Sequence, residues 1–114
     1  MPEKRDIYTA KIYFNGRAGA GKLRPVVILN DFSNGWYTVV EITSISPKDP
    51  PSHFDSFKEP IIKWQECGLD ESSWVKCHKS NRHNIESERL HKNIGIMDVE
   101  DFYNTIVSIY TKNQ

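Results

Sequence analysis

The feature that most constrains the fold is a glycine-rich segment, residues 15–23, that ends at Arg24-Pro25. The following residues, 26–29, are Val-Val-Ile-Leu, and this run predicts a buried strand. The glycines and Lys22 also approach the P-loop pattern that binds nucleotide phosphates. However, Leu23 lacks the hydroxyl that holds Mg²⁺, and a strand follows where the P-loop requires a helix. The segment therefore predicts a loop leading into a strand, without nucleotide binding.

The length of 114 residues predicts one domain, 1–114, with a single core. No apolar run is long enough to span a bilayer, and residues 1–6 are not followed by the apolar stretch of a signal peptide. These features predict a cytoplasmic protein that does not enter a membrane. In that compartment we expect Cys67 and Cys77 to stay reduced and to pack as small apolar side chains.

Charge is balanced over the chain, with 15 basic and 15 acidic side chains, which argues against a long electrostatic footprint on nucleic acid. The distribution is uneven. Residues 1–30 carry six Lys or Arg against two acids, residues 31–75 carry three against eight, and residues 76–92 carry five against two. If the fold brings the first and third segments together, they form a local basic groove for a short nucleic-acid segment. The alternative is scattered, solvated charge.

Alternation and turn signals predict a small antiparallel β-fold. Strands are expected at residues 6–14, 25–29 and 36–43, with a turn at Asn34-Gly35 before the third. The proline-rich residues 44–57 predict a long exposed loop, because proline cannot donate to a sheet. Short strands near 60–64 and 73–79 bring the total to about five, which close most simply into a small barrel. Residues 86–91 predict one helical turn.

The C-terminal residues predict an α-helix that begins after Asp98, a good N-cap, with Asp101 three residues further on. Apolar side chains then recur at helical spacing: Val99, Phe102, Tyr103, Ile106, Val107, Ile109 and Tyr110. We expect this face to pack on the barrel or on a second subunit. Tyr103 and Tyr110 are accordingly predicted to lie in the core or in an interface. The predicted fold is mainly β with a C-terminal helix.

The order of these segments resembles the MazF/PemK family of toxins from type II toxin-antitoxin systems, and the resemblance covers nearly the whole chain. It is carried by Asp6-Ile7-Tyr8, by Arg24-Pro25 before a hydrophobic strand, by Ile42-Thr43-Ser44, by residues 73–79 and by Ile94-Gly95-Ile96 before the helix. The resemblance implies an SH3-like barrel of the CcdB/MazF type and a homodimer. It also implies an mRNA interferase, that is, a metal-independent endoribonuclease that cleaves single-stranded RNA at short sequences, and a cognate antitoxin as partner.

The resemblance places the family's catalytic arginine at Arg24 and its strand-end threonine at Thr43. Attack of a ribose 2′-OH on the adjacent phosphate needs a proton acceptor, a cation for the phosphorane charge and a proton donor for the leaving 5′-oxygen. Arg24 suits the stabilisation of phosphate charge, and Thr43 can donate a hydrogen bond to a non-bridging oxygen. Without the resemblance, each residue is an ordinary one for its position.

The segment around His78 departs from the family pattern, in which many members carry an acidic residue or a glutamine. By strand alternation Trp74, Lys76 and His78 lie opposite the core-facing Val75 and Cys77. His78 is therefore hypothesised to transfer the proton, the alternative being a solvated His78 and a Trp74 in a dimer interface. The residues expected to contact RNA are Arg17, Lys22, Ser44, Trp74, Lys76, Lys79 and Arg82.

No metal or other cofactor is expected. The paired short spacing of structural zinc sites is missing, and the adjacent Cys77 and His78 would point to opposite faces of a strand. The alternative function is a catalytically inactive or divergent relative that binds RNA or antitoxin. A CcdB-like gyrase poison is disfavoured, because such proteins end in Trp-Gly-Ile whereas this chain ends in Thr111-Lys112-Asn113-Gln114.

Overall fold

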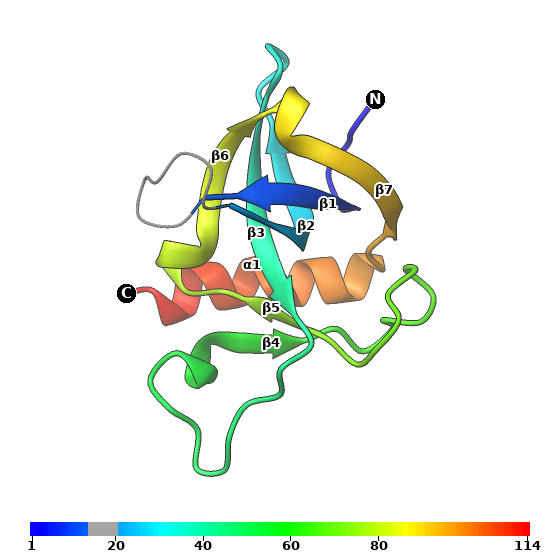
Figure 1. The fold of residues 1–114 in the computed structure, drawn as a ribbon. Coiled ribbons are helices and arrows are strands. Elements are labelled where there is room, and N and C mark those ends of the chain that lie inside the picture. Colours follow the sequence, from blue (N-terminus) through cyan, green and yellow to red (C-terminus); the bar gives the residue numbers. More distant parts are fainter. Residues whose placement is uncertain (14–20) are drawn as a thin grey trace.

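The computed structural model describes residues 1–13 and 21–114. A strongly curved antiparallel sheet lies against one long helix (Figure 1). The strands are β1 (Asp6–Ile12), β2 (Lys22–Asp31), β3 (Trp36–Thr43), β4 (Lys58–Pro60), β5 (Trp74–Lys76), β6 (Arg82–Glu86) and β7 (Leu90–Ile96). The helices are the short 3₁₀ turns η1 (Asp55–Phe57), η2 (Lys79–Asn81) and η3 (Ser87–Arg89), and the α-helix α1 (Val99–Lys112).

The central strand is β3, which is shared by two parts of the sheet. Its first residues, Trp36–Val40, pair with β6, and its last two, Ile42 and Thr43, pair with β5. The full path runs β4-β5-β3-β2-β1-β7, with β6 pairing β3 off this path, and it does not close on itself. The predicted class, mainly β with a C-terminal helix, is confirmed as a barrel-like antiparallel sheet.

The described residues form seven strands and not about five. The two unpredicted strands, β6 and β7, carry mostly exposed or half-exposed side chains, and in β6 only Ile85 is buried. Such strands lack the apolar alternation on which sequence-based prediction depends. The helical turn expected at 86–91 is η3, between them. The strand expected at 60–64 ends at Pro60, and the one expected at 73–79 is three residues long.

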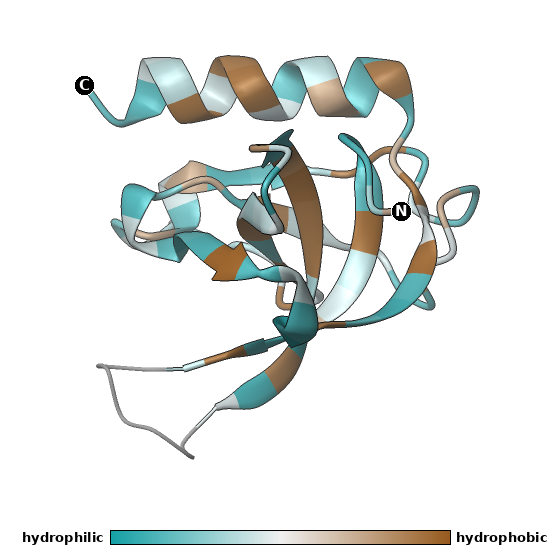
Figure 2. Cartoon of the chain, turned by 90° about the horizontal axis from the view of Figure 1, so that it is seen from above, coloured by the Kyte–Doolittle hydropathy of each residue, from teal (hydrophilic) through white to brown (hydrophobic). Residues whose placement is uncertain are grey.

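The core consists of two apolar clusters on the two faces of the central strands. Because side chains alternate along a strand, Val27 and Val40 contribute to the first cluster and their neighbours Val26 and Val39 to the second. Figure 2 shows the apolar central strands lying beneath the helix. The first cluster includes both cysteines as free thiols, as expected, and burial raises the pKa of Cys77 to about 12.

Side chains alternate regularly along β1. Ala10 and Ile12 belong to the second apolar cluster and Tyr8 packs against it, whereas Ile7 belongs to the first. Ile7 and Ala10 are both fully buried because the two clusters cover the two faces of this strand. The register between β1 and β7 shifts between Ile7 and Tyr8 and again between Thr9 and Ala10, and the extra residues lie in β7.

Helix α1 begins as predicted, because the Asp98 side chain accepts a hydrogen bond from the Glu100 N–H at 3.0 Å. The predicted apolar face is buried only in part. Ile109 lies in the first cluster and Phe102 packs against it, whereas Tyr103 and Tyr110 are 66% and 67% exposed and do not pack in the core of this chain. The other expectation for the two tyrosines, an interface with a second subunit, stays a prediction. The buried residues of α1 are Asp101, Thr105, Ser108 and Ile109.

Asp101 is buried because it satisfies the backbone of a neighbouring loop. Its two carboxylate oxygens accept the N–H groups of Ile62 and Lys63 at 3.1 and 3.0 Å. Buried backbone donors need such acceptors. The helix therefore docks partly through polar contacts, which hydrophobic periodicity does not predict.

The loop predicted at 44–57 contains no strand and ends in η1. Asp55 holds it together, since its carboxylate accepts the N–H groups of Lys48 and Ser52, both at 3.1 Å, and pairs with Lys58 at 3.0 Å. These bonds lower the pKa of Asp55.

No helix among residues 1–13 and 21–114 is long and apolar enough to cross a membrane.

Candidate functional site

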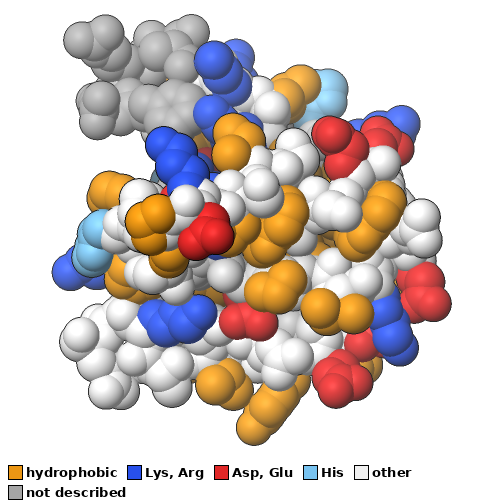
Figure 3. All heavy atoms as spheres, turned by 90° about the horizontal axis from the view of Figure 1, so that it is seen from below, with side chains coloured by type: hydrophobic (Ala, Val, Ile, Leu, Met, Phe, Trp, Pro, Cys, Tyr) orange, Lys and Arg blue, Asp and Glu red, His pale blue; other side chains and the backbone are white. Residues whose placement is uncertain are grey.

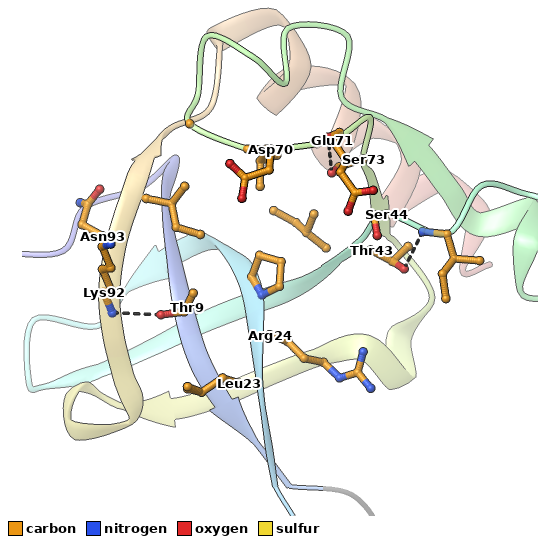
Figure 4. A pocket seen from close by; sticks show the side chains of 16 residues that line it. Thr9, Leu23, Arg24, Thr43, Ser44, Asp70, Glu71, Ser73, Lys92 and Asn93 are labelled. Carbon is orange, nitrogen blue, oxygen red and sulfur yellow. Dashed lines mark hydrogen bonds between the residues drawn. The ribbon is translucent and has the colours of Figure 1, made fainter.

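A groove of about 640 Å³ lies beside the start of β2 and the end of β3. Its lining comes from these strands, from the 68–73 loop and from β1 and β7. Figure 4 shows Arg24, Thr43 and Ser44 on one side of it, Lys92 and Asn93 on the other, and Asp70 and Glu71 along the wall opposite Arg24. The groove thus carries cations and hydrogen-bonding groups on two sides and carboxylates on a third.

Arg24 and Thr43, the two residues predicted at the chemical centre, line the same groove. The antiparallel register of β2 and β3 accounts for this placement. Val26 of β2 pairs with Glu41 of β3. Because Arg24 lies two residues before Val26 and Thr43 lies two residues after Glu41, both come to the same end of the strand pair. The Thr43 hydroxyl accepts the N–H of Ile45 at 3.1 Å. Its own hydrogen is therefore available for a second acceptor, such as a phosphate oxygen.

Glu41 is the centre of a charged cluster that sequence analysis did not single out. Its side chain is only 2% exposed. Oε2 accepts hydrogen bonds from His83 Nε2 at 2.8 Å and from Asn81 Nδ2 at 3.2 Å. Oε1 lies 3.8 Å from both Arg24 Nε and Lys76 Nζ. Side chains from β2, β5, η2 and β6 therefore meet at one buried carboxylate.

The environment of Glu41 favours its ionised form. Burial raises the pKa of this carboxyl, but the hydrogen bonds from His83 and Asn81 and the charge of Lys76 outweigh burial, so the net pKa lies below its ordinary value. A signal for this site was present in the sequence. Glu41 interrupts the apolar run Val39-Val40-Glu41-Ile42, and a carboxylate at such a position must find cationic partners.

Of the described cations expected to bind RNA, Lys76 belongs to the Glu41 cluster, and none of them lines the groove. Lys76 contacts Glu41, whereas Lys22 begins β2, Lys79 begins η2 and Arg82 begins β6. Of the residues predicted to contact RNA, Ser44 lines the groove and Trp74 is half-buried where β5 pairs with Thr43. Arg17 lies outside the described residues. Arg24 belongs to both the groove and the Glu41 cluster.

His78 lies in a separate aromatic cluster. Its ring packs edge-on against Phe57 and Phe54, with centroids 4.7 and 4.9 Å away, and lies 5.9 Å from the ring of His53. His78 Nδ1 is 2.7 Å from the Ser80 hydroxyl and accepts the Ser80 N–H. Desolvation, with the nearby His53 and Lys79, lowers the pKa of His78. These contacts are with the 53–57 loop and η2, and none joins His78 to Arg24 or Thr43.

Within the described part of the chain, no three His, Cys, Asp or Glu side chains group closely enough to hold a metal ion. On the face seen from below, most Lys and Arg side chains lie toward the left of the view and most Asp and Glu side chains toward the right (Figure 3).

The sequence identifies the protein family to which the chain belongs. Residues 3–106 match the family model of the PemK-like, MazF-like toxin of type II toxin-antitoxin systems, and the chain belongs to that family. None of the curated protein sequences compared with the chain matches it significantly.

Solved structures share the fold at low sequence identity. Mycobacterium tuberculosis toxin MazF-mt6 is 23% identical, with 92% of each chain covered and a TM-score of 0.66. An endoribonuclease in complex with its cognate antitoxin, from a mycobacterial species, is 12% identical, covers 97% of this chain and 93% of its own, and has a TM-score of 0.70. A MazE-MazF structure from Deinococcus radiodurans is 14% identical, with 97% and 94% covered and a TM-score of 0.69.

Proposed function

We propose that this chain is the toxin of a type II toxin-antitoxin system and acts as an mRNA interferase. In this proposal it cleaves single-stranded RNA at a short sequence, without a metal ion, by attack of a ribose 2′-OH on the adjacent phosphate. The observation that supports it best is the convergence of Arg24 and Thr43 on one groove. Membership of the toxin family and the likeness to a mycobacterial endoribonuclease agree with this proposal.

The proposed chemistry divides the work among these side chains. Arg24, held beside Glu41, stabilises the extra negative charge of the phosphorane. Thr43 donates its hydroxyl hydrogen to a non-bridging oxygen. The products are a 2′,3′-cyclic phosphate and a free 5′-hydroxyl. His78 is the residue that sequence analysis assigns to proton transfer, and this role remains a prediction.

The RNA backbone is proposed to follow the cations beside Arg24. Lys76 and Arg82 would bind phosphates on this side, with contributions from Arg17, Lys22, Ser44, Trp74 and Lys79. Asp70 and Glu71 in the groove would then face bases, because carboxylates are repelled by phosphates but can accept hydrogen bonds from base edges, and the Asn93 amide can pair with either.

The proposed protein partners are a cognate antitoxin and a second copy of the chain. An antitoxin with an acidic segment would compete with RNA for the same cations. A homodimer is supported by the exposed apolar residues Val99, Tyr103, Val107 and Tyr110 on one helix. The proposed location is the cytoplasm.

The test is cleavage of a mixed single-stranded RNA in EDTA by the purified chain and by Arg24→Ala. We expect the wild type to cut at a short sequence, and loss of Arg24 to lower the rate about 10²–10³-fold. Sequencing of the RNA ends then gives the cleavage site. Intact RNA with the wild type would contradict the proposal, and RNA binding without cleavage would indicate the inactive, RNA-binding relative instead.

A further inference from the structure

Two titratable groups of the charged cluster, Glu41 and His83, take no part in proton transfer in the chemistry proposed so far. They form the shortest contact of the charged cluster, at 2.8 Å between Oε2 and Nε2. The Glu41 carboxylate is almost fully buried, whereas the His83 ring is 24% exposed. One partner is therefore fixed inside the fold and the other reaches its surface.

This pairing sets the chemistry of the imidazole. Because an ionised carboxylate can only accept, Nε2 of His83 carries the hydrogen that is donated to Glu41. In the neutral ring, Nδ1 is then the basic nitrogen with a free lone pair. The carboxylate also stabilises the imidazolium that forms when Nδ1 takes up a proton. A buried carboxylate behind a histidine is the arrangement that orients general bases in hydrolytic enzymes.

The same carboxylate connects His83 to the phosphate-binding arginine. Oε1 of Glu41 lies 3.8 Å from Arg24 Nε and Oε2 lies 2.8 Å from His83. Glu41 and Thr43 are two residues apart in β3, so their side chains leave the same face of the strand. Arg24 is 33% exposed. One carboxylate therefore holds a candidate base at one of its oxygens and a cation at the other.

We propose that His83 is the proton-transfer residue of RNA cleavage and that Glu41 is a positioning residue, which orients His83 and Arg24 together. This inference rests on the proposed endoribonuclease function. It places proton transfer at His83 instead of His78, whose contacts lie in the aromatic cluster with Phe54 and Phe57.

Nδ1 of neutral His83 takes the proton of the ribose 2′-OH as the 2′-oxygen forms a bond to phosphorus. The bond between phosphorus and the 5′-oxygen breaks, and the imidazolium returns the proton to that oxygen. The ring is neutral again at the end, and no metal ion, oxidant or second substrate is consumed.

The experiment compares the pH dependence of RNA cleavage for the wild type, His83→Gln, Glu41→Gln and a control, His91→Gln, whose exposed side chain lies on β7. General-base catalysis contributes about 10²–10⁴-fold. We expect His83→Gln to lose about 10²–10³ in kcat and to lose the acid limb of the kcat/KM profile. Its affinity for a 2′-deoxy analogue, which cannot be cleaved, should stay within about threefold of wild type, and His91→Gln should behave as wild type.

Glu41→Gln tests the positioning role. A neutral amide no longer stabilises the imidazolium, so the acid limb should move to lower pH while a reduced rate remains. If this variant does not fold, Glu41→Asp, which keeps the charge, should retain the position of the acid limb with a lower kcat. A merely structural role for Glu41 would lower the rate without moving the limb.

Two results would overturn the proposal while leaving the enzyme established. One is a His83→Gln variant with the wild-type rate and pH profile when Arg24→Ala is inactive. The other is loss of the acid limb in His78→Gln but not in His83→Gln. If wild type and Arg24→Ala both leave RNA intact, the proposed function itself fails, and the role of His83 fails with it.

Discussion

At the scale of single residues, the molecule is organised around Glu41. A buried carboxylate is stable only when cations and donors surround it, and here Arg24, Lys76, His83 and Asn81 do so. Each of these partners is partly exposed, so the buried carboxylate fixes the positions of side chains that reach the surface. The site is thus preorganised by an interior residue that lies outside the groove lining.

Glu41 also predicts how stability depends on pH. Because its pKa in the folded state lies below the ordinary value, its contribution is present above the pKa of about 4.3 of an unfolded glutamate and is lost as pH falls through the lower folded value. We expect the unfolding free energy of wild type to decrease below about pH 5, more steeply than that of Glu41→Gln. Urea unfolding at pH 7 and pH 3.5 measures this. Parallel losses in the two proteins would contradict it, and Glu100→Gln, at an exposed position, serves as the control.

At the scale of elements, helix α1 docks through a carboxylate as well as through apolar side chains. Asp101 accepts two backbone N–H groups of the 61–63 segment, and Thr105 donates to the Asp101 carbonyl at 2.9 Å. The first cluster of the core, with Ile61, Met97 and Ile109, lies next to these bonds. Orientation of the helix is therefore set by polar and apolar contacts together.

Removal of the Asp101 carboxylate should destabilise the fold. Asp101→Ala leaves the Ile62 and Lys63 donors without their acceptor, which costs about 2–3 kcal/mol of unfolding free energy. Glu100→Ala, one residue earlier and exposed, should change it by less than about 1 kcal/mol. Chemical denaturation of both variants checks this difference. Equal effects would show that the loop contacts are not what the helix depends on.

At the scale of the whole molecule, one apolar face of α1 stays exposed among the residues that the structure describes. Val99, Tyr103, Val107 and Tyr110 recur at helical spacing and are all exposed. Their spacing forms a stripe on the side of the helix away from Asp101, Thr105 and Ser108, which face the sheet. In the proposed homodimer this stripe would be covered by a second copy.

The predicted homodimer can be tested by placing negative charges in its proposed interface. Tyr103→Glu combined with Tyr110→Glu should shift the chain from dimer to monomer, because two carboxylates would have to be buried in an apolar interface. Light scattering coupled to size-exclusion chromatography gives the mass directly. Phe32→Glu, an exposed aromatic in the turn between β2 and β3, is the matched control and should remain dimeric. A monomeric wild type would contradict the prediction at once.

Signals from residues adjacent in sequence were sufficient to predict several elements of this fold. The bounds of β3 follow from an Asn-Gly turn and a β-branched run, and the start of α1 follows from an N-cap aspartate, because both depend on residues adjacent in sequence. The partial exposure of Trp74 and Lys76 on either side of the buried Val75 follows from strand alternation. The order of motifs also sufficed to indicate the toxin family.

The remaining features depend on contacts between distant residues. The strands β6 and β7 form because their backbones pair with β3 and β1, although their side chains are mostly solvated. Helix α1 turns Asp101 inward because a loop 39 residues away in sequence needs an acceptor. The sequence by itself determined the fold class, the terminal helix and the pairing of Arg24 with Thr43 as candidates, since these are properties of local pattern and motif order. Only the tertiary structure decided that Glu41 joins Arg24 to His83, because a buried charge takes its partners from whichever strands the fold brings to it.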